Sequence, residues 1–268
     1  MHVGDPMSNF KMPVSEYMTK GPVVLKATDS TVAAEAALDE HGITAVGVVD
    51  EGGKLVGVLS RTDLLQAADG ESGETFRIPD APISEFMSSD PLTVTPDSPV
   101  DEAAKKMLKK RFHRVFVADE SGEAVGVFST RDVMRAVHEK KVKIPAIEIA
   151  TTSVIKVKGD DPIALAVDRL DLSNRHGLIV THDRWPVGTF SQVDALLARA
   201  KEPSTAVEEV MECRILALPP TTPLHRVAQQ ALAMNVRRVV LVSEQSHDGV
   251  EGVLSSFDYC RVVAASMS

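Results

Sequence analysis

The sequence contains little cysteine and few aromatic residues. Cys213 and Cys260 are the only cysteines among 268 residues, and Phe, Trp and Tyr together make up 4%. Two isolated cysteines build neither a disulfide framework nor a zinc site, and the histidines show no metal-binding spacing. We therefore expect a reduced, cytoplasmic protein without a metal centre, whose core is built from Val, Leu, Ile and Ala.

Long apolar runs and an excess of positive charge are also missing. No stretch approaches the roughly 20 apolar residues that a membrane-spanning helix needs, and the N-terminus lacks the apolar region of a secretory signal. We therefore expect no membrane partner. The net charge of −9 disfavours binding to nucleic acids, because their phosphates require Lys and Arg.

A seven-residue motif occurs four times along the chain. The copies are GVLSRTD at 57–63, GVFSTRD at 126–132, GTFSQVD at 188–194 and GVLSSFD at 252–258. They are spaced by 69, 62 and 64 residues. Similar segments precede them, such as 14–32 and 83–100, whereas the third of these, 146–163, lacks the methionine of the others. The chain is therefore an internal fourfold repeat.

Each repeat predicts the order strand, helix, strand, strand, helix, which is an α/β (α+β) fold. In the second repeat, Ser98, Pro99 and Asp101 predict a helix that starts with a capping box. Polar turns such as 50–53 and 119–122 join two strands into a hairpin, and Gly42 is a helix stop. The second helix of each repeat is expected to begin at the motif serine.

One repeat of about 55–60 residues is marginal for burying its own core, so we expect the repeats to pair. We predict a tail at 1–13, a first pair at 14–137 made of repeats 14–68 and 83–137, and a linker at 138–145. The second pair is expected at 146–268, with repeats 146–199 and 206–265. Residues 69–82 link the first two repeats.

This pattern resembles the CBS domain family. The resemblance is carried by these segments: Met18-Thr19 before Gly21-Pro22-Val23, Val48-Val49-Asp50, Met87-Ser88, Pro91, Val117-Ala118-Asp119, Arg237-Arg238-Val239-Val240 and the four motifs. It implies two pseudo-twofold pairs, called Bateman modules, that regulate by binding AMP, ADP, ATP or S-adenosylmethionine, with Mg²⁺ as a companion of ATP. It also implies either a homodimer or a disc of four repeats within one chain, and a regulated protein that the sequence does not name.

The motif chemistry suits a nucleotide. The motif serine lies where a strand ends and a helix begins, and such N-termini favour phosphate. The motif aspartate accepts hydrogen bonds only, so it suits the two ribose hydroxyls. We assign the ribose to Asp63, Asp132, Asp194 and Asp258. We assign the phosphate to Ser60, Arg61, Arg114, Ser129, Thr130, Arg131, Ser191 and Ser255. The resemblance implies an adenine slot, which we assign to Pro22, Val24, Val46, Pro91, Thr93 and Val115.

Two alternatives stay open for these residues. Ser-x-x-Asp before a helix is also a capping box with no ligand. The motif glycines lie inside strands, where glycine costs stability, so either a ligand or a neighbouring helix approaches the backbone there. The third repeat has Ala150 in place of the methionine and a Trp185-Pro186 turn, which places its site in doubt.

The stretch 105–143 is basic. It carries eleven Lys and Arg residues, and the segment 101–143 has a net charge of about +4. A solvated helix face explains this, as does a docking surface for an acidic partner or nucleic acid. We expect no enzyme, because the repeated motif explains the serines and aspartates better than a catalytic triad does. The leading hypothesis is an adenosine-ligand sensor, and the rival is a ligand-free scaffold for oligomerisation or partner docking.

Overall fold

The computed structural model describes residues 10–68, 78–173, 177–245 and 249–265. The chain divides into two compact units, the N-terminal unit (described residues 10–133 together with 263–265) and the C-terminal unit (134–262). The chain crosses from one unit to the other inside two helices, α4 (Thr130–Glu139) and α8 (Ser256–Ala265). Part of the expected linker, 69–77, lies outside the described residues.

The N-terminal unit holds the first two repeats. The first contains η1 (Val14–Glu16), β1 (Thr19–Lys20), β2 (Val24–Lys26), α1 (Thr31–Glu40), β3 (Ala45–Val49), β4 (Leu55–Ser60) and α2 (Arg61–Ala67). The second contains η2 (Ile83–Glu85), β5 (Ser88–Ser89), β6 (Thr93–Val94), α3 (Val100–Lys110), β7 (Arg114–Ala118), β8 (Ala124–Ser129) and α4 (Thr130–Glu139).

The C-terminal unit holds the last two repeats. The third contains η3 (Ala146–Glu148), β9 (Lys156–Lys158), α5 (Ile163–Ser173), β10 (Gly177–His182), β11 (Trp185–Ser191), α6 (Gln192–Leu197) and η4 (Ala198–Ala200). The fourth contains η5 (Val207–Glu209), β12 (Leu216–Leu218), α7 (Leu224–Ala233), β13 (Arg238–Val242), β14 (Val250–Ser255) and α8 (Ser256–Ala265). The expected order of elements is confirmed, in the third repeat as in the others.

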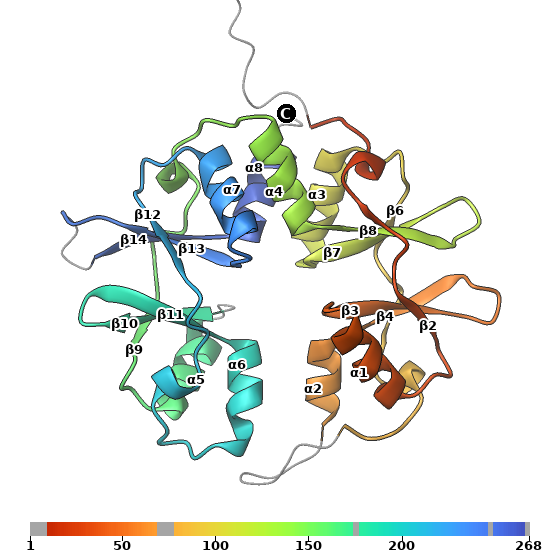
Figure 1. The fold of residues 1–268 in the computed structure, drawn as a ribbon, viewed down its shortest axis with the longest axis horizontal. Helices are drawn as coiled ribbons and strands as arrows, with labels where there is room; N and C mark the ends of the chain where they lie inside the picture. The colour runs from red at the N-terminus through yellow and green to blue at the C-terminus, as the bar shows by residue number, and fades with distance from the viewer. Residues whose placement is uncertain (1–9, 69–77, 174–176, 246–248, 266–268) are drawn as a thin grey trace, which may run out of the picture. The chain divides into compact units, whose positions relative to one another are not determined.

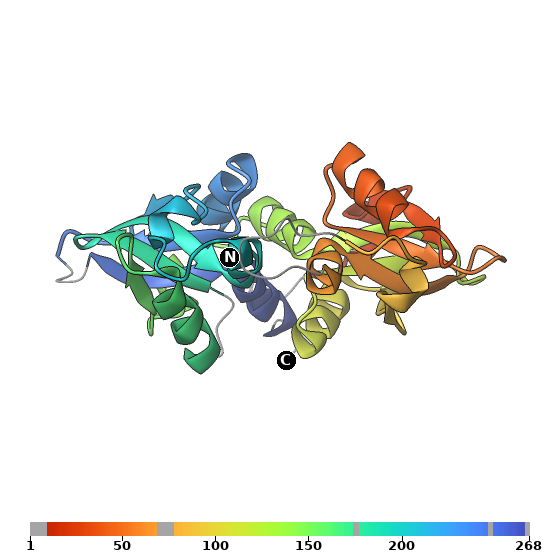
Figure 2. The same cartoon turned by 90° about the horizontal axis from the view of Figure 1, so that it is seen from below.

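Each repeat builds a small mixed sheet. The first strand runs parallel to the middle strand, and the middle strand pairs antiparallel with the motif strand, as in β2-β3-β4 and β12-β13-β14. The helices of each repeat lie on one face of its sheet (Figures 1 and 2). In the N-terminal unit, Val49 and Leu55 of the first repeat pack with Phe116 of the second. In the C-terminal unit, Ile179 of the third repeat packs with Val240 of the fourth.

The two repeats of a unit exchange the short segments that precede their first strands. We call these lead segments: residues 10–20, 81–89, 144–151 and 203–212. β1 pairs with β8 of the second repeat, and β5 pairs with β4 of the first. In the C-terminal unit, the bridges Thr151↔Val253 and Thr189↔Glu212 repeat this arrangement. Each repeat is therefore completed by its partner, as expected for units too small to bury their own cores.

The start of α3 corrects one sequence prediction. Ser98 does not cap the helix, which begins at Val100, with Pro99 as its N-cap. The Ser98 hydroxyl instead accepts from the Thr95 N–H at 3.0 Å. The lead segment explains the difference, because the Asp101 N–H donates to the carbonyl of Phe10. The buried Asp101 carboxylate also contacts Lys11 Nζ at 2.7 Å.

Candidate functional site

All four motifs fold into the same local structure. In the first, Asp63 Oδ2 accepts from the Ser60 N–H at 2.7 Å and from the Ser60 hydroxyl at 2.6 Å. The equivalent distances are 2.8 and 2.7 Å for Ser129/Asp132, 2.7 and 2.6 Å for Ser191/Asp194, and 2.6 and 2.9 Å for Ser255/Asp258. The capping interaction is therefore present in every copy, and it uses one carboxylate oxygen of each aspartate.

The second carboxylate oxygen distinguishes the copies. Among the described residues, no hydrogen bond reaches Oδ1 of Asp63 or Asp194, and both side chains are half-buried. Asp258 is 4% exposed, and its Oδ1 accepts from Arg261. Burial raises the pKa of Asp258, and hydrogen bonds from Ser255 together with the positive charge of Arg261 oppose that rise. Asp63 and Asp194 therefore keep an acceptor for a ligand hydroxyl.

An arginine from the second repeat reaches toward the first motif of each unit. Arg114 begins β7 opposite Ser129, and its guanidinium donates to the Thr44 hydroxyl just before β3. The Thr44 carbonyl accepts from the Arg61 N–H at 3.0 Å, so Arg114 lies near the start of α2. Ala45 pairs with Ser60 in the sheet, so Thr44, which precedes Ala45, lies beside the start of α2.

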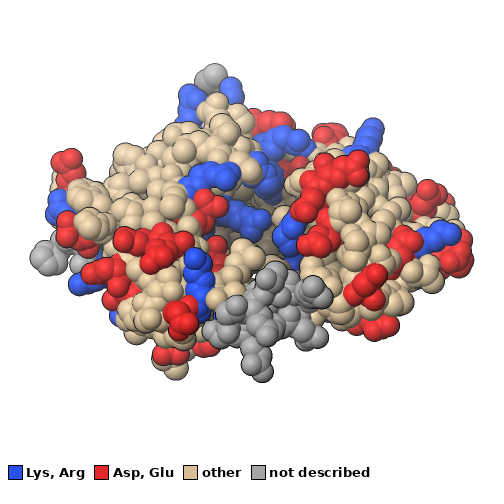
Figure 3. Space-filling model, turned by 60° about the horizontal axis from the view of Figure 1, so that its bottom comes forward, with Lys and Arg blue, Asp and Glu red and all other residues tan. Residues whose placement is uncertain are grey.

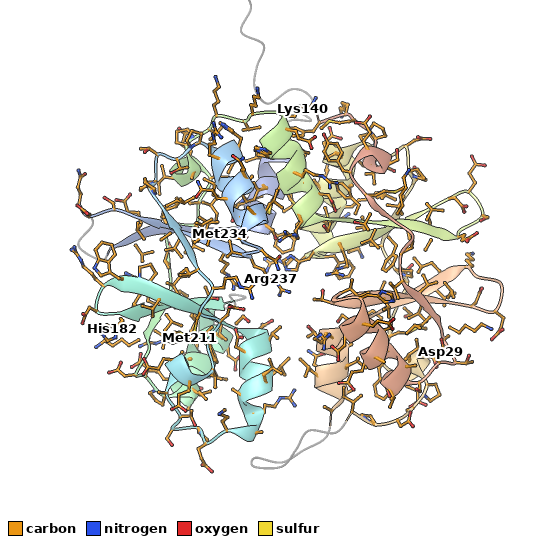
Figure 4. All side chains as sticks on the ribbon, viewed as in Figure 1. Asp29, Lys140, His182, Met211, Met234 and Arg237 are labelled. Atoms are coloured by element: carbon orange, nitrogen blue, oxygen red, sulfur yellow. The ribbon has the colours of Figure 1, made fainter. Side chains whose placement is uncertain are left out.

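The C-terminal unit has a corresponding arginine at this place. Arg238 begins β13 opposite Ser255, and its guanidinium covers Gly177 at the start of β10. A β-carbon on Gly177 would lie 2.6 Å from Arg238 Nη2, so a larger residue at this position would displace the guanidinium. Burial lowers the pKa of Arg238, and the negative charge of Asp194 opposes that change. Figure 4 labels Arg237, the neighbour that precedes Arg238 at this strand start.

The other candidate residues differ in their partners and in their exposure to solvent. The Arg61 guanidinium binds Asp39 at 2.7 Å, which turns it toward the end of α1. Val46 and Val115 are fully buried in the core, whereas Val24 is 39% exposed. Thr130 is buried, Arg131 is exposed, and Pro22 and Pro91 are half-buried.

Thr93 belongs to a different region from the motif residues. It lines an open groove of about 560 Å³ with Lys54, Lys106 and the 119–122 turn. This groove lies at the hairpin end of β7, whereas Arg114 and Ser129 lie at the opposite end of that strand. Two of its charged groups have local partners: Lys106 pairs with Glu102 at 3.0 Å, and Asp119 accepts from its own turn.

The motif glycines are explained by the exchanged lead segments. A β-carbon on Gly57 would meet Met87 Sδ at 2.5 Å, and one on Gly126 would meet Met18 Sδ at 2.6 Å. Gly188 faces Met211 at 2.6 Å, and Met211 is labelled in Figure 4. In the fourth motif, Gly252 faces Ala150 at 3.1 Å. Neither a ligand nor a helix is needed, because a lead segment of the partner repeat makes the close approach.

The basic stretch is exposed along α3. Lys105, Lys109, Lys110 and Arg111 are exposed, as are Lys140, Lys141 and Lys143 after α4. Acidic side chains are spread over the visible surface of both units (Figure 3). No described helix has the length and apolar character to cross a membrane, and no His, Cys, Asp and Glu cluster of metal-binding kind occurs among the described residues.

Sequence reasoning missed Thr44, Gly177 and Arg261, and it gave no role to the methionines. The strand-starting arginines were visible, since Arg114 was assigned to the phosphate and Arg238 was part of the family pattern. The residue that faces each arginine depends on pairing between repeats, which a linear pattern does not show. Arg261 follows Asp258 by three residues, a spacing that places two side chains on one helix face, so this signal was available.

Comparisons with known proteins agree with this architecture. The CBS domain family matches residues 14–70, 83–139 and 207–265. An uncharacterised 17.7 kDa protein of Acidianus ambivalens is 30% identical over 145 residues, which cover 53% of this chain and 85% of that protein. A-adding tRNA nucleotidyltransferase of Aquifex aeolicus is 34% identical over 134 residues, which cover 50% of this chain but only 15% of the enzyme.

A solved structure matches nearly the whole chain. Protein MJ1225 of Methanocaldococcus jannaschii, described as a putative archaeal homologue of the AMPK γ subunit, gives a TM-score of 0.73 at 17% identity. The match covers 93% of this chain and 99% of that one. This likeness shows the fold, and it includes the third repeat, which the family match omits. The family match covers more than half of the residues, and on that basis the chain belongs to the CBS domain family.

Proposed function

We propose that this protein is a regulatory protein that binds an adenosine-containing ligand at the first motif of each unit. In this proposal, the open oxygen of Asp63 or Asp194 accepts from the ribose hydroxyls. Arg114 or Arg238, contributed by the partner repeat, neutralises the phosphate. The observation that carries the proposal is the contact of Arg238 with Gly177, because it holds a half-buried cation beside the motif of the other repeat.

The division of charge supports a phosphorylated nucleoside. A carboxylate repels phosphate and attracts hydroxyl donors, whereas a guanidinium binds phosphate oxygens with charge-assisted hydrogen bonds. One residue of each kind stands at each first motif, and the two come from different repeats. A ligand that contacts both would connect the two repeats. The adenine base itself comes from the family resemblance and not from a described side chain.

Regulation follows if the ligand has different affinities for two arrangements of the repeats. A ligand held by both repeats of a unit makes contacts that depend on their mutual position. A partner protein, or a second copy of this chain, would then detect the change. The scaffold alternative predicts a nucleotide position already filled by protein side chains, and Asp258 shows that feature because Arg261 occupies its second oxygen.

The test is isothermal titration of the full chain with AMP, ADP, ATP, S-adenosylmethionine, adenosine and GMP, with and without Mg²⁺. Co-purified nucleotide is first extracted and identified. We expect binding of at least one adenosine ligand, no comparable binding of GMP, and loss of binding when Asp63→Asn and Asp194→Asn are combined. Equal heats for the double variant and the parent would contradict the proposed sites, and the absence of binding by every adenosine ligand would favour the scaffold.

A further inference from the structure

The two motif aspartates of the C-terminal unit have different partners. Both use Oδ2 to accept from their own serine, Ser191 or Ser255. The other oxygen of Asp194 has no hydrogen bond among the described residues, whereas the other oxygen of Asp258 accepts from Arg261. Asp194 is half-buried, and Asp258 is 4% exposed. The same motif therefore presents a usable acceptor in one repeat and a satisfied one in the other.

Arg261 is held at two points. Its Nη2 atom contacts Asp258 Oδ1 and also donates to the carbonyl of Ile149 at 2.9 Å. Ile149 follows η3 in the lead segment of the third repeat, which packs on the fourth repeat. The guanidinium thus connects a motif aspartate to the partner repeat, the same kind of connection that we propose for a nucleotide.

The sequence distinguishes the two repeats at this position. Leu197 stands three residues after Asp194, where the fourth repeat has Arg261. Leucine has no donor, so Asp194 cannot receive the same contact from its own helix. In the N-terminal unit, Gln66 follows Asp63 and Arg135 follows Asp132 at this spacing. The arginine therefore occurs in the second repeat of each unit.

The cation from the opposite strand follows the reverse pattern. Arg238 of the fourth repeat stands beside the third motif, where the negative charge of Asp194 opposes the lowering of its pKa. The position of the third repeat that corresponds to Arg238 is Gly177, since each pairs with its own motif serine. Glycine offers no cation to the fourth motif. Two independent features, an occupied acceptor and a missing partner cation, therefore distinguish the Asp258 motif from the Asp194 motif.

We propose that Arg261 occupies the ribose position at Asp258, so that the C-terminal unit binds its phosphorylated ligand at Asp194 only. This inference rests on the proposed function, because it assumes that motif aspartates bind ribose. The side chain of Arg261 acts as a built-in substitute for the ligand. It satisfies the buried carboxylate and ties the two repeats together at that motif.

The experiment uses the full chain carrying Asp63→Asn and Asp132→Asn, which removes both motif carboxylates of the N-terminal unit. AMP and adenosine are titrated by calorimetry into this parent and into its Asp194→Asn, Asp258→Asn and Arg261→Ala derivatives. Asparagine keeps an acceptor for the serine, so the helix start is preserved. Circular dichroism and thermal melting check that each protein is folded.

We expect one AMP site in the parent, at least a tenfold loss of AMP affinity in Asp194→Asn, and a change of less than twofold in Asp258→Asn. Arg261→Ala is expected to add a second site for adenosine, because it exposes the Asp258 oxygen. A tenfold loss in Asp258→Asn, or a stoichiometry that stays at one in folded Arg261→Ala, would overturn the inference. If Arg261→Ala does not fold, the Asp258→Asn result decides. Absence of binding in the unmodified chain would instead reject the proposed function.

Discussion

The guanidinium of Arg238 lies against the backbone of Gly177, where a β-carbon would come within 2.6 Å of Nη2. The two residues belong to different repeats and start the middle strands β13 and β10 of the C-terminal unit. Because Gly177 has no side chain, the guanidinium of Arg238 can occupy the space beside its backbone. This relationship places a cation beside the third motif, and it gives the first test of how the proposed site works.

Gly177→Ala should displace Arg238 while leaving the fold nearly intact. The clashing atoms belong to the end of a flexible side chain, so the arginine can move at little cost to the backbone. The loss of one hydrogen bond to a charged group costs about 1.5–3 kcal/mol of binding free energy. We therefore expect the AMP affinity to fall about tenfold or more. Calorimetry measures this in the Asp63→Asn/Asp132→Asn background, with uncharged adenosine as the control ligand. An equal loss for adenosine would show that the arginine does not serve the phosphate.

Arg114→Ala and Arg61→Ala form a matched pair in the N-terminal unit. Arg61 binds Asp39 in an exposed ion pair, and such pairs contribute about 0–1 kcal/mol to stability. We expect Arg61→Ala to leave AMP affinity within twofold of the parent value and Arg114→Ala to lower it about tenfold, by the loss of one charged hydrogen bond. Titration in an Asp194→Asn background isolates this unit. A larger effect of Arg61→Ala than of Arg114→Ala would reverse the assignment.

The sequence alone was sufficient for the repeated order of elements, because local signals specify it. Ser60 and Asp63 cap a helix through contacts three residues apart, and Gly42 ends a helix with φ of +59°. The exchange of lead segments was not predictable in this way. The contact between Met18 and Gly126 joins residues that no periodic pattern relates, and it replaced the expected ligand or helix as the reason for the glycine.

The sequence predicted only part of the candidate site, because the rest of the site depends on contacts between repeats. The motif identified Asp194 and Asp258 as equivalent, and the structure shows that their surroundings differ. Gly177 carries no side chain that would mark it as a site residue, and its role exists only because Arg238 of the next repeat covers it. Properties that depend on pairing between repeats therefore had to come from the structure.

Gly188→Ala should destabilise the C-terminal unit more than Gly252→Ala does. At position 188, a β-carbon would lie 2.6 Å from Met211 Sδ and 2.9 Å from the backbone carbonyl of Glu212. At position 252, the nearest atom is the Ala150 β-carbon at 3.1 Å. Overpacking of a tight site costs about 1–3 kcal/mol, and we expect Gly188→Ala to fall in this range. We expect Gly252→Ala to cost less. Urea denaturation of both variants measures the difference, and equal losses would contradict the proposed role of the methionine.

Asp258 should make the stability of the protein fall as the pH rises. Burial raises its pKa in the folded protein above the ordinary value of 3.8, so the folded state holds this proton more tightly than the unfolded state does. Stability then decreases as the pH rises from 3.8 through the raised pKa. In Asp258→Asn this contribution is absent, so the variant should gain stability relative to the parent as the pH rises from 3.8 through the raised pKa of Asp258.

Denaturant titrations of both proteins at several pH values across this interval provide the measurement, and Asp39→Asn is an exposed control. The informative result is whether the stability of the variant rises or falls relative to the parent as the pH rises. The absolute difference is less informative, because the variant also loses the attraction between Asp258 and Arg261 at every pH at which the carboxylate is charged. If the stability of Asp258→Asn falls relative to the parent as the pH rises, the charged carboxylate is net favourable. Arg261 would then outweigh burial, and the pKa of Asp258 would lie below its ordinary value.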